Sequence, residues 1–223
     1  LFRSRDKDGD VDEINTGISL GARIRLLKNG AWGFAYTTDL SKLNEITDTA
    51  IQLSNSLTGD VELSESEGIK DKVKVDVKIP FKDISIEEKK EIMKAANDAA
   101  SIEKVNSTTV SYSDGEINEI FMNSEGSEIQ TVTSKIRMAL NASATDGEII
   151  QFGHGSIGGV EGFELIRETD IEGFGREIGE KAVRLLEAEA APSGKYPVIA
   201  DPQLTGALTH EALGHDVDGD LIL

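Results

Sequence analysis

The stretch TTVSYSDGEINEIFMNSEGSEIQTVTSKIRMALNASATDGEIIQF, residues 108–152, decides the fold class. It is rich in Val, Ile, Thr and Tyr, which are typical of strands. Three dipeptides typical of turns divide it, namely Asp114-Gly115, Glu125-Gly126 and Asp146-Gly147. This pattern predicts a β meander that reverses at each dipeptide. The glycine-rich segment 153–162 that follows predicts a flexible loop, which lets the backbone approach a neighbour.

Two β-hairpins are predicted before the meander. Asp8-Gly9 is a turn signal between two short extended runs, and Asn29-Gly30 is a second one. Apolar residues alternate from Ile18 to Leu26 before the second turn and from Trp32 to Tyr36 after it, with the period of a strand. The same alternation of Val and Ile predicts a strand over residues 72–79 that ends at Pro80.

Four helices are predicted from apolar periodicity and from N-cap residues. The predicted helices and their caps are 39–54 after Thr38 or Asp39, 86–100 after Ser85, a helix from Thr169 or Asp170 to about residue 190, and a last helix after Asp201 with Pro202 in its first position. A short strand over 196–200 precedes the last helix. Groups of strands that alternate with long helices predict an α+β fold. We expect an N-terminal α/β domain of antiparallel strands and packed helices over residues 1–195, followed by a second region over 196–223.

The composition is strongly acidic. Asp and Glu number 41 and Lys and Arg number 23, so the net charge is −18. This charge repels phosphate backbones and anionic membranes, and it argues against direct binding to nucleic acid or to a membrane surface. The absence of cysteine excludes thiol nucleophiles and disulfides within the chain and fits a reducing cytoplasm. The first residue, Leu1, and the apolar end 221–223 predict that the chain is part of a longer protein.

The hexapeptide His210-Glu211-Ala212-Leu213-Gly214-His215 predicts metal chemistry. Imidazoles bind zinc, and a carboxylate beside the first imidazole can take a proton from zinc-bound water. The histidines are five residues apart, so a regular α-helix would turn the second about 140° from the first. A π-bulge would bring them together, and so would a helix that ends at a left-handed Gly214. The alternative is two unrelated histidines near a helix end.

Two histidines do not complete a catalytic zinc site, which usually has three protein ligands. The candidates for a third ligand within the chain are Asp216, Asp218, Asp220 and His154.

Two other motifs are rejected. Residues 153–158 match G-x-G-x-x-G, but no helix begins at the last glycine, so dinucleotide binding is not expected. Residues 6–10 resemble the start of a calcium loop but lack its glycine and its final glutamate, so we interpret them as a hairpin turn.

The segment from Gly194 to Pro202, the hexapeptide His210–His215 and Asp220 together resemble the signature of TldD-type proteins of the TldD/PmbA family. Three further blocks resemble the family in the same order along the chain, namely the hairpin 19–37, the turn 123–126 and the segment 153–163. The resemblance spans almost the whole chain and about the N-terminal half of a typical member. Asp216 departs from the family pattern, because a small residue is common at that position.

The resemblance implies a zinc metallopeptidase. It implies that His210 and His215 bind Zn²⁺, that Glu211 is the general base, and that the third ligand is a cysteine beyond Leu223. Members of the family degrade unfolded or extended peptides, and they were first described as modulators of DNA gyrase. They act as homodimers or as heterodimers with a PmbA-type subunit. We therefore expect a TldD-like peptidase portion that is inactive by itself. The alternatives are a catalytically silent peptide-binding subunit and a gyrase-regulating subunit.

Overall fold

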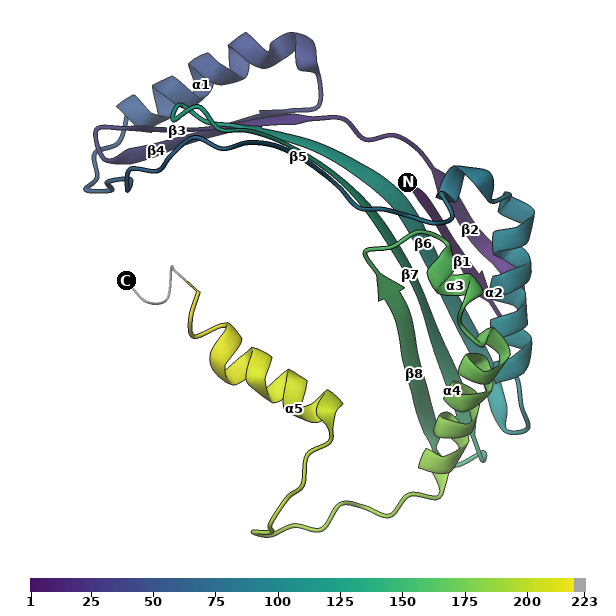
Figure 1. The fold of residues 1–223 in the computed structure, drawn as a ribbon. Helices are drawn as coiled ribbons and strands as arrows, with labels where there is room; N and C mark the ends of the chain where they lie inside the picture. The colour runs from purple at the N-terminus through teal and green to yellow at the C-terminus, as the bar shows by residue number, and fades with distance from the viewer. Residues whose placement is uncertain (219–223) are drawn as a thin grey trace. The chain divides into compact units, whose positions relative to one another are not determined.

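The computed structural model describes residues 1–218, whose internal contacts divide them into two units, Leu1–Ala188 and the residues from Glu189 onward. In the first unit, largely antiparallel strands carry helices against one face, which confirms the predicted α+β class (Figure 1). Among the helices of residues 1–218, none combines the length and the apolar composition needed to cross a membrane.

Two strands of 18 residues form the centre of the main sheet. They are β6 (Val105–Met122) and β7 (Glu128–Thr145), and they pair antiparallel along their length. The hairpin of β1 (Phe2–Lys7) and β2 (Asp10–Thr16) extends the sheet beyond β6, in the order β2-β1-β6-β7. On the other side of β7, β5 (Lys70–Lys74) pairs in parallel with its first residues, and β8 (Ile150–Gly159) pairs antiparallel with its last.

Two of the three predicted meander turns are present, and one is wrong. Gly126 and Gly147 have φ angles of 91° and 98° in the turns after β6 and β7, as their dipeptides predict. Asp114-Gly115 instead lies within β6, where Asp114 pairs with Ile136 and Gly115 with Lys135. Asp114 points into the core and is 4% exposed, so its carboxylate is used in a buried contact and not in a turn.

The glycine-rich segment is strand β8, so the predicted flexible loop is wrong. Helix α4 (Ile171–Leu186) packs directly on the strand and explains the glycines at positions 153 and 155. A Cβ atom at Gly153 would lie 2.1 Å from the carbonyl oxygen of Ile178 in α4, well inside the shortest contact that a real Cβ makes. The expectation that these glycines let the backbone approach a neighbour is therefore correct, although the segment is not a loop.

A second, two-stranded sheet is formed by the predicted hairpin, β3 (Ala22–Lys28) and β4 (Ala31–Thr37). Asn29 and Gly30 both have positive φ, at 53° and 69°, as a two-residue hairpin turn requires. A short 3₁₀ turn, η1 (Leu40–Lys42), leads into helix α1 (Leu43–Asn55). The helix buries Ile46 and Ala50 against β3 and β4, so this part of the chain has a small core of its own.

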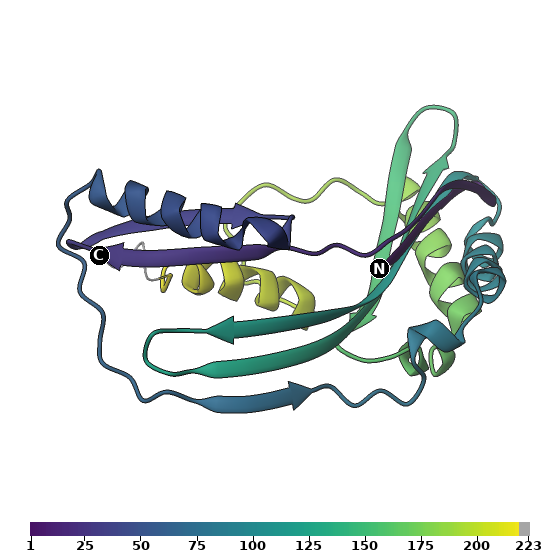
Figure 2. The same cartoon turned by 90° about the horizontal axis from the view of Figure 1, so that it is seen from above.

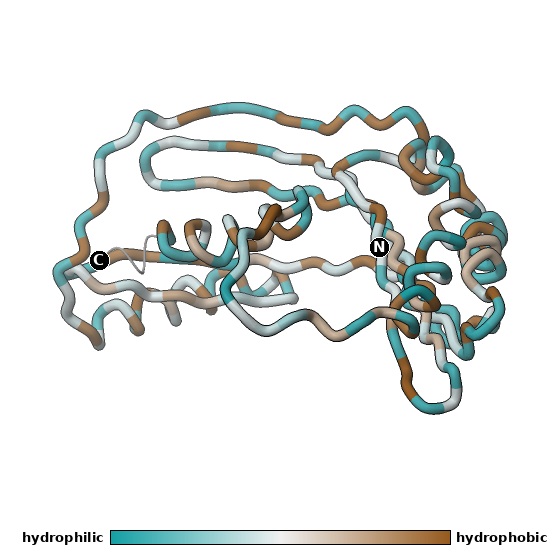
Figure 3. Tube along the Cα trace, turned by 90° about the horizontal axis from the view of Figure 1, so that it is seen from below, coloured by the Kyte–Doolittle hydropathy of each residue, from teal (hydrophilic) through white to brown (hydrophobic). Residues whose placement is uncertain are grey.

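Helices α2 (Ile86–Ala100) and α4 lie side by side against the helix-covered face of the main sheet (Figures 1 and 2). The 3₁₀ turn η2 (Phe81–Asp83) precedes α2, and the short helix α3 (Glu164–Arg167) precedes α4. Apolar residues alternate with polar ones along the strands, so only one face of the sheet joins the core (Figure 3). The core residues below 2% exposure include Val110 from β6, Met138 and Leu140 from β7, Met93 from α2, and Phe163.

Two predicted boundaries and one predicted strand differ from the structure. Strand β5 ends at Lys74, and not near Pro80, and the N–H groups of Lys78 and Ile79 donate to the carboxylate of Glu164 instead of to a neighbouring strand. Helix α4 ends at Leu186. Residues 196–200 form no strand, since no strand of residues 1–218 pairs with them.

Candidate metal centre

The candidate centre begins with helix α5 (Pro202–Thr209), which starts as the sequence predicts. The side chain of Asp201 accepts a hydrogen bond of 2.7 Å from the N–H of Leu204. Pro202 occupies the first turn, where its missing N–H costs nothing. This cap sets the start of the helix that carries His210 one residue beyond its end.

The chain then continues as a single π-helical turn, η3 (His210–Gly214). The N–H of His215 donates to the carbonyl oxygen of His210 over 3.1 Å, which is a hydrogen bond between residues five apart. Of the two local structures that could bring the histidines together, the structure therefore has the π-bulge, and Gly214 is not left-handed. The wider turn compensates for the five-residue spacing and places the two imidazole centroids 4.6 Å apart.

Three potential metal donors converge on this turn. One ligand atom each from His210, Glu211 and His215 lies within 4.8 Å of the other two. The closest recorded approach between the carboxylate and an imidazole joins Glu211 Oε2 and His215 Nε2 over 4.0 Å. Donors around a tetrahedral zinc ion lie about 3.4 Å apart, given bonds of about 2.0–2.1 Å. Small side-chain rotations would therefore bring these donors around a zinc ion, and the residues present fit this metal.

The three donors are open to solvent in the described chain. All three residues are exposed, and the side chains of His215 and Glu211 are 52% and 72% exposed. A catalytic zinc keeps a position for water or substrate. Two imidazoles beside one carboxylate can therefore hold a metal ion and place a proton acceptor next to it.

The remaining candidate ligands are not equivalent. Asp218 Oδ2 lies 3.9 Å from His215 Nδ1, on the side of the ring that faces away from Glu211. Asp216 does not join the donor cluster, and Asp220 lies outside the described residues. His154 lies in β8 of the first unit, where its Nδ1 is 2.8 Å from Asn141 Oδ1. That contact gives His154 a structural partner in its own sheet.

Sequence reasoning missed one basic surface in the first unit. Arg3 and Arg5 of β1 and Arg137 of β7 project from the face of the main sheet that no helix covers. In the sequence, basic residues alternate with inward-facing residues from Phe2 to Lys7, and this alternation indicates that the basic residues share one face of the strand. It does not show that Arg137 joins them, because β7 lies two strands away and periodicity concerns one strand at a time.

Family models match the chain over most of the first unit. The model of the "PmbA/TldA metallopeptidase domain 1" matches residues 7–54, and that of the "PmbA/TldA metallopeptidase central domain" matches residues 79–186. The two matches follow the order of the domains in the family. They end before the His210–His215 turn, so the candidate centre lies outside both.

Two curated relatives align with nearly all of the chain. A metalloprotease of Methanothermobacter thermautotrophicus is 48% identical over 217 residues, which are 97% of this chain and 48% of the relative. A "zinc metalloprotease TldD homolog" of Saccharolobus solfataricus is 27% identical over 220 residues, which are 96% of this chain and 47% of the relative. The chain thus spans about half the length of the curated relatives it matches.

Solved structures show the same fold. A protein of Bacteroides thetaiotaomicron described as a modulator of DNA gyrase superposes with a TM-score of 0.78 at 20% identity, over 96% of this chain and 50% of the other. TldE of Thermococcus kodakarensis superposes with a TM-score of 0.55 at 17% identity, over 83% and 41%. At these identities the likeness concerns the fold alone.

The helix-covered sheet and the two matched domains define the class of the protein, which is that of the metallopeptidases that contain these two domains. Within that class, the chain belongs to the TldD/PmbA family.

Proposed function

We propose that this chain is the N-terminal part of a TldD-like, zinc-dependent peptidase that acts on unfolded or extended peptides. The observation that carries the proposal is the π-helical turn, which brings ligand atoms of His210, Glu211 and His215 within 4.8 Å of one another. In this proposal His210 and His215 hold the zinc. The resemblance to the TldD/PmbA family implies that the third ligand is a cysteine beyond Leu223, and the proposal includes this ligand.

Each residue of the turn has a distinct part in the proposed reaction. Zinc supplies Lewis acidity, which lowers the pKa of water and polarises a carbonyl group. Glu211 accepts the proton that water loses as it attacks the peptide carbonyl carbon, and it then delivers this proton to the nitrogen of the leaving amine. His210 and His215 act through their position, since the π-turn holds both imidazoles on the side of the helix where Glu211 lies.

The cellular setting follows from the same proposal. The relatives are named metalloproteases, and one is named a zinc enzyme, which supports a peptide substrate. The TldE fold of a structural neighbour supports a dimer of this chain with itself or with a PmbA-type subunit. The absence of cysteine and the charge of −18 support a cytoplasmic protein that binds neither nucleic acid nor membranes directly.

Metal content measured by mass spectrometry on the full-length protein tests the site. We expect one zinc per wild-type protein and its loss in His210→Ala. His154→Ala is the matched control, because it removes the third histidine of the chain and is expected to keep the zinc. Zinc that remains in His210→Ala, or zinc that is lost in His154→Ala, would refute the assignment.

Glu211→Gln separates catalysis from metal binding. This variant keeps the length and polarity of the side chain but cannot accept a proton. We expect it to retain zinc and to lose peptide hydrolysis by about 10²-fold or more. Hydrolysis by Glu211→Gln at the wild-type rate would contradict the mechanism.

We also expect the 223-residue chain alone to bind zinc weakly and to be inactive. Peptide binding without cleavage by the zinc-loaded wild type would favour a silent subunit.

A further inference from the structure

The uncovered face of the main sheet carries a trough along β6. The inward side chains of β6 include Val110, Tyr112 and Asp114, so the residues that alternate with them point to the opposite, open face. These open-face residues are Ser111, Ser113 and Gly115. They are small, and each of them has a long basic residue beside it on at least one adjacent strand. We call this feature the cationic trough, with the three small residues as its floor.

The walls of the trough come from β1 and β7. In the pairing register Ser113 lies between Arg3 of β1 and Arg137 of β7. Ser111 has Arg5 beside it on β1, and Gly115 has Lys135 beside it on β7. All four basic residues are exposed. Opposite walls are two strand spacings apart, which is about 10 Å, so the trough has the width of one extended chain.

The trough is hollow as well as basic. Two adjoining cavities of about 540 Å³ and 800 Å³ lie along it and share Arg3, Ser113 and Arg137 in their linings. The larger cavity continues past Lys135 to apolar side chains, and Ile18 among them is 98% exposed. The trough therefore offers positive charge along its middle and an apolar end.

The positive charge is largely unneutralised. Within residues 1–218, Arg3, Lys135 and Arg137 have no carboxylate within the 4.0 Å of an ion pair. Arg5 is paired with Asp12, and Glu13 lies at the outer margin on β2. Three basic side chains without an ion pair around Ser113 give the trough a local preference for negative charge.

We propose that the cationic trough binds an extended, acidic segment of a peptide, with its carboxylates beside Arg3 and Arg137. Guanidinium groups pair with carboxylates in a fixed geometry, and the floor from Ser111 to Gly115 is long enough for about four to six extended residues. A nucleic acid fits less well, because its dense phosphate charge meets the repulsion of the remaining acidic surface. The peptide lies on side chains and adds no strand to the sheet edge.

This inference deepens the proposed function, because it names acidic peptides as a preferred substrate class. Binding to the trough does not need the metal centre, however. The two proposals can therefore fail separately, since His210→Ala should lose zinc but bind an acidic peptide as the wild type does.

The experiment is a fluorescence-anisotropy titration with two labelled peptides of about six residues. One peptide carries Asp and Glu, the other carries Asn and Gln at the same positions, and both contain one Leu for the apolar end. We expect the acidic peptide to bind about threefold to tenfold more tightly at low salt, and we expect this advantage to shrink at higher ionic strength. Equal binding of the two peptides would overturn the proposal.

Variants locate the binding. The double variant Arg3→Gln/Arg137→Gln should abolish the preference for the acidic peptide, and Ser113→Glu should do the same by placing a carboxylate between the arginines. Arg176→Gln on α4 removes the same charge from an exposed residue outside the trough, so it should leave the preference unchanged. Circular dichroism checks that each variant is folded.

Three results would overturn the proposal. The first is an unchanged preference in folded Arg3→Gln/Arg137→Gln or in Ser113→Glu. The second is displacement of the peptide by a short single-stranded oligonucleotide at equal charge concentration, which would assign the trough to phosphate binding. The third is a change of oligomeric state in the double variant without any effect on the peptide, which would assign the trough to a second copy of the chain.

Discussion

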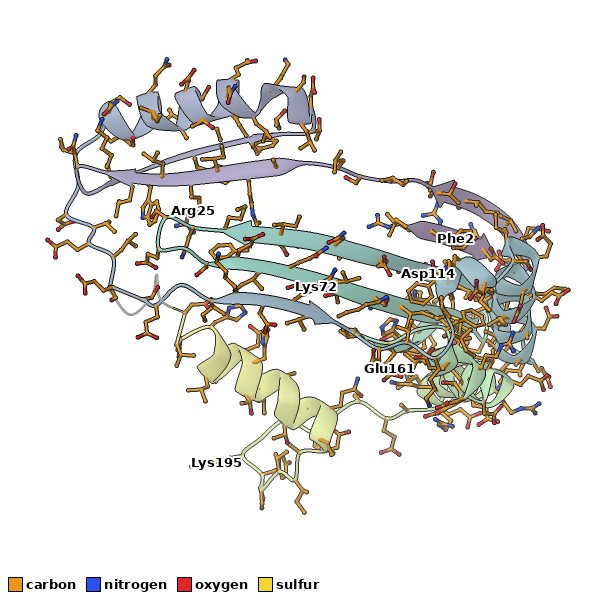
Figure 4. All side chains as sticks on the ribbon, turned by 45° about the horizontal axis from the view of Figure 1, so that its top comes forward. Phe2, Arg25, Lys72, Asp114, Glu161 and Lys195 are labelled. Carbon is orange, nitrogen blue, oxygen red and sulfur yellow. The ribbon has the colours of Figure 1, made fainter. Side chains whose placement is uncertain are left out.

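Asp114 shows at the scale of single residues why a local turn signal can fail. Its Oδ2 lies 2.5 Å from Lys89 Nζ of helix α2, and the two side chains are 4% and 5% exposed. The hydroxyl of Tyr112 donates to the same oxygen over 2.7 Å, and burial together with this bond raises the pKa of Tyr112. The ammonium group of Lys89 also lies 4.6 Å from the ring centroid of Phe2, which pairs with Asp114 in the sheet (Figure 4).

The first prediction concerns this buried ion pair. Lys89→Met should lower the free energy of unfolding by about 3–5 kcal/mol, because it leaves the Asp114 carboxylate buried without its counterion. Lys89→Met/Asp114→Asn should recover part of the loss, because no unpaired charge then remains in the core. Urea denaturation of the three proteins measures this difference. A double variant less stable than Lys89→Met would show that the uncompensated charge is not the cause.

Glu164 connects elements that are far apart in the sequence. It lies at the start of α3, is 5% exposed and accepts hydrogen bonds from three backbone N–H groups outside the helix. These donors are Gly162 at 3.0 Å, Ile79 at 2.9 Å and Lys78 at 3.2 Å. Burial raises the pKa of Glu164, but the backbone hydrogen bonds outweigh this effect and lower the pKa to about 2. A single carboxylate therefore fixes the segment after β5 against α3.

The second prediction concerns the pH dependence of this link. Because the folded pKa lies below the ordinary value of 4.5, ionised Glu164 stabilises the fold above that pH, and this contribution disappears as the pH falls from 4.5 to about 2. Glu164→Gln should cost about 1–3 kcal/mol at neutral pH, since one amide oxygen cannot replace the carboxylate. The difference from wild type, measured by denaturation at several pH values, should narrow as the pH falls through that window.

Glu168→Gln is the matched control for this prediction. Glu168 lies four residues further on, and its side chain is 67% exposed in a surface ion pair with Lys78. Its loss should change the stability by less than about 1 kcal/mol. The assigned role of the carboxylate would be contradicted if the free energies of unfolding of Glu164→Gln and wild type differed by the same amount at neutral pH and at pH 2.

At the scale of the whole molecule, the chain consists of two units joined by an exposed segment. Residues 187–200 contain no helix or strand, and Lys195 lies within them (Figure 4). The other long irregular segment, residues 57–69, contains neither Lys nor Arg. The basic residues of the first unit lie mostly in strands and helices, where a protease has poor access to the backbone.

The third prediction is a first tryptic cut after Lys195. Limited proteolysis followed by mass spectrometry should yield residues 1–195 as the earliest large product, because the segment around Lys195 is both exposed and irregular. Lys195→Gln should slow this cut and leave the stability of the first unit unchanged. A first cut within residues 1–186 would contradict the proposed border between a domain over 1–195 and the region that follows.

Much of the local structure follows from the sequence alone. The capping residues Asp39, Ser85, Asp170 and Asp201 all accept the expected backbone hydrogen bonds, because a cap depends on groups only two or three residues apart. The turn at Asn29-Gly30 and the pairing of its strands follow for the same reason. The five-residue histidine spacing restricted the candidate metal centre to two local structures.

Only the tertiary structure decided the rest, because its causes are distant in the sequence. Gly153 and Gly155 of β8 lie against helix α4, and Asp114 within β6 pairs with Lys89 of α2. The segment after β5 is held by Glu164, more than 80 residues further on, which accepts hydrogen bonds from the N–H groups of Lys78 and Ile79. The cationic trough exists because β1 and β7 flank β6, whereas the periodicity of each strand reports only which of its own residues share a face.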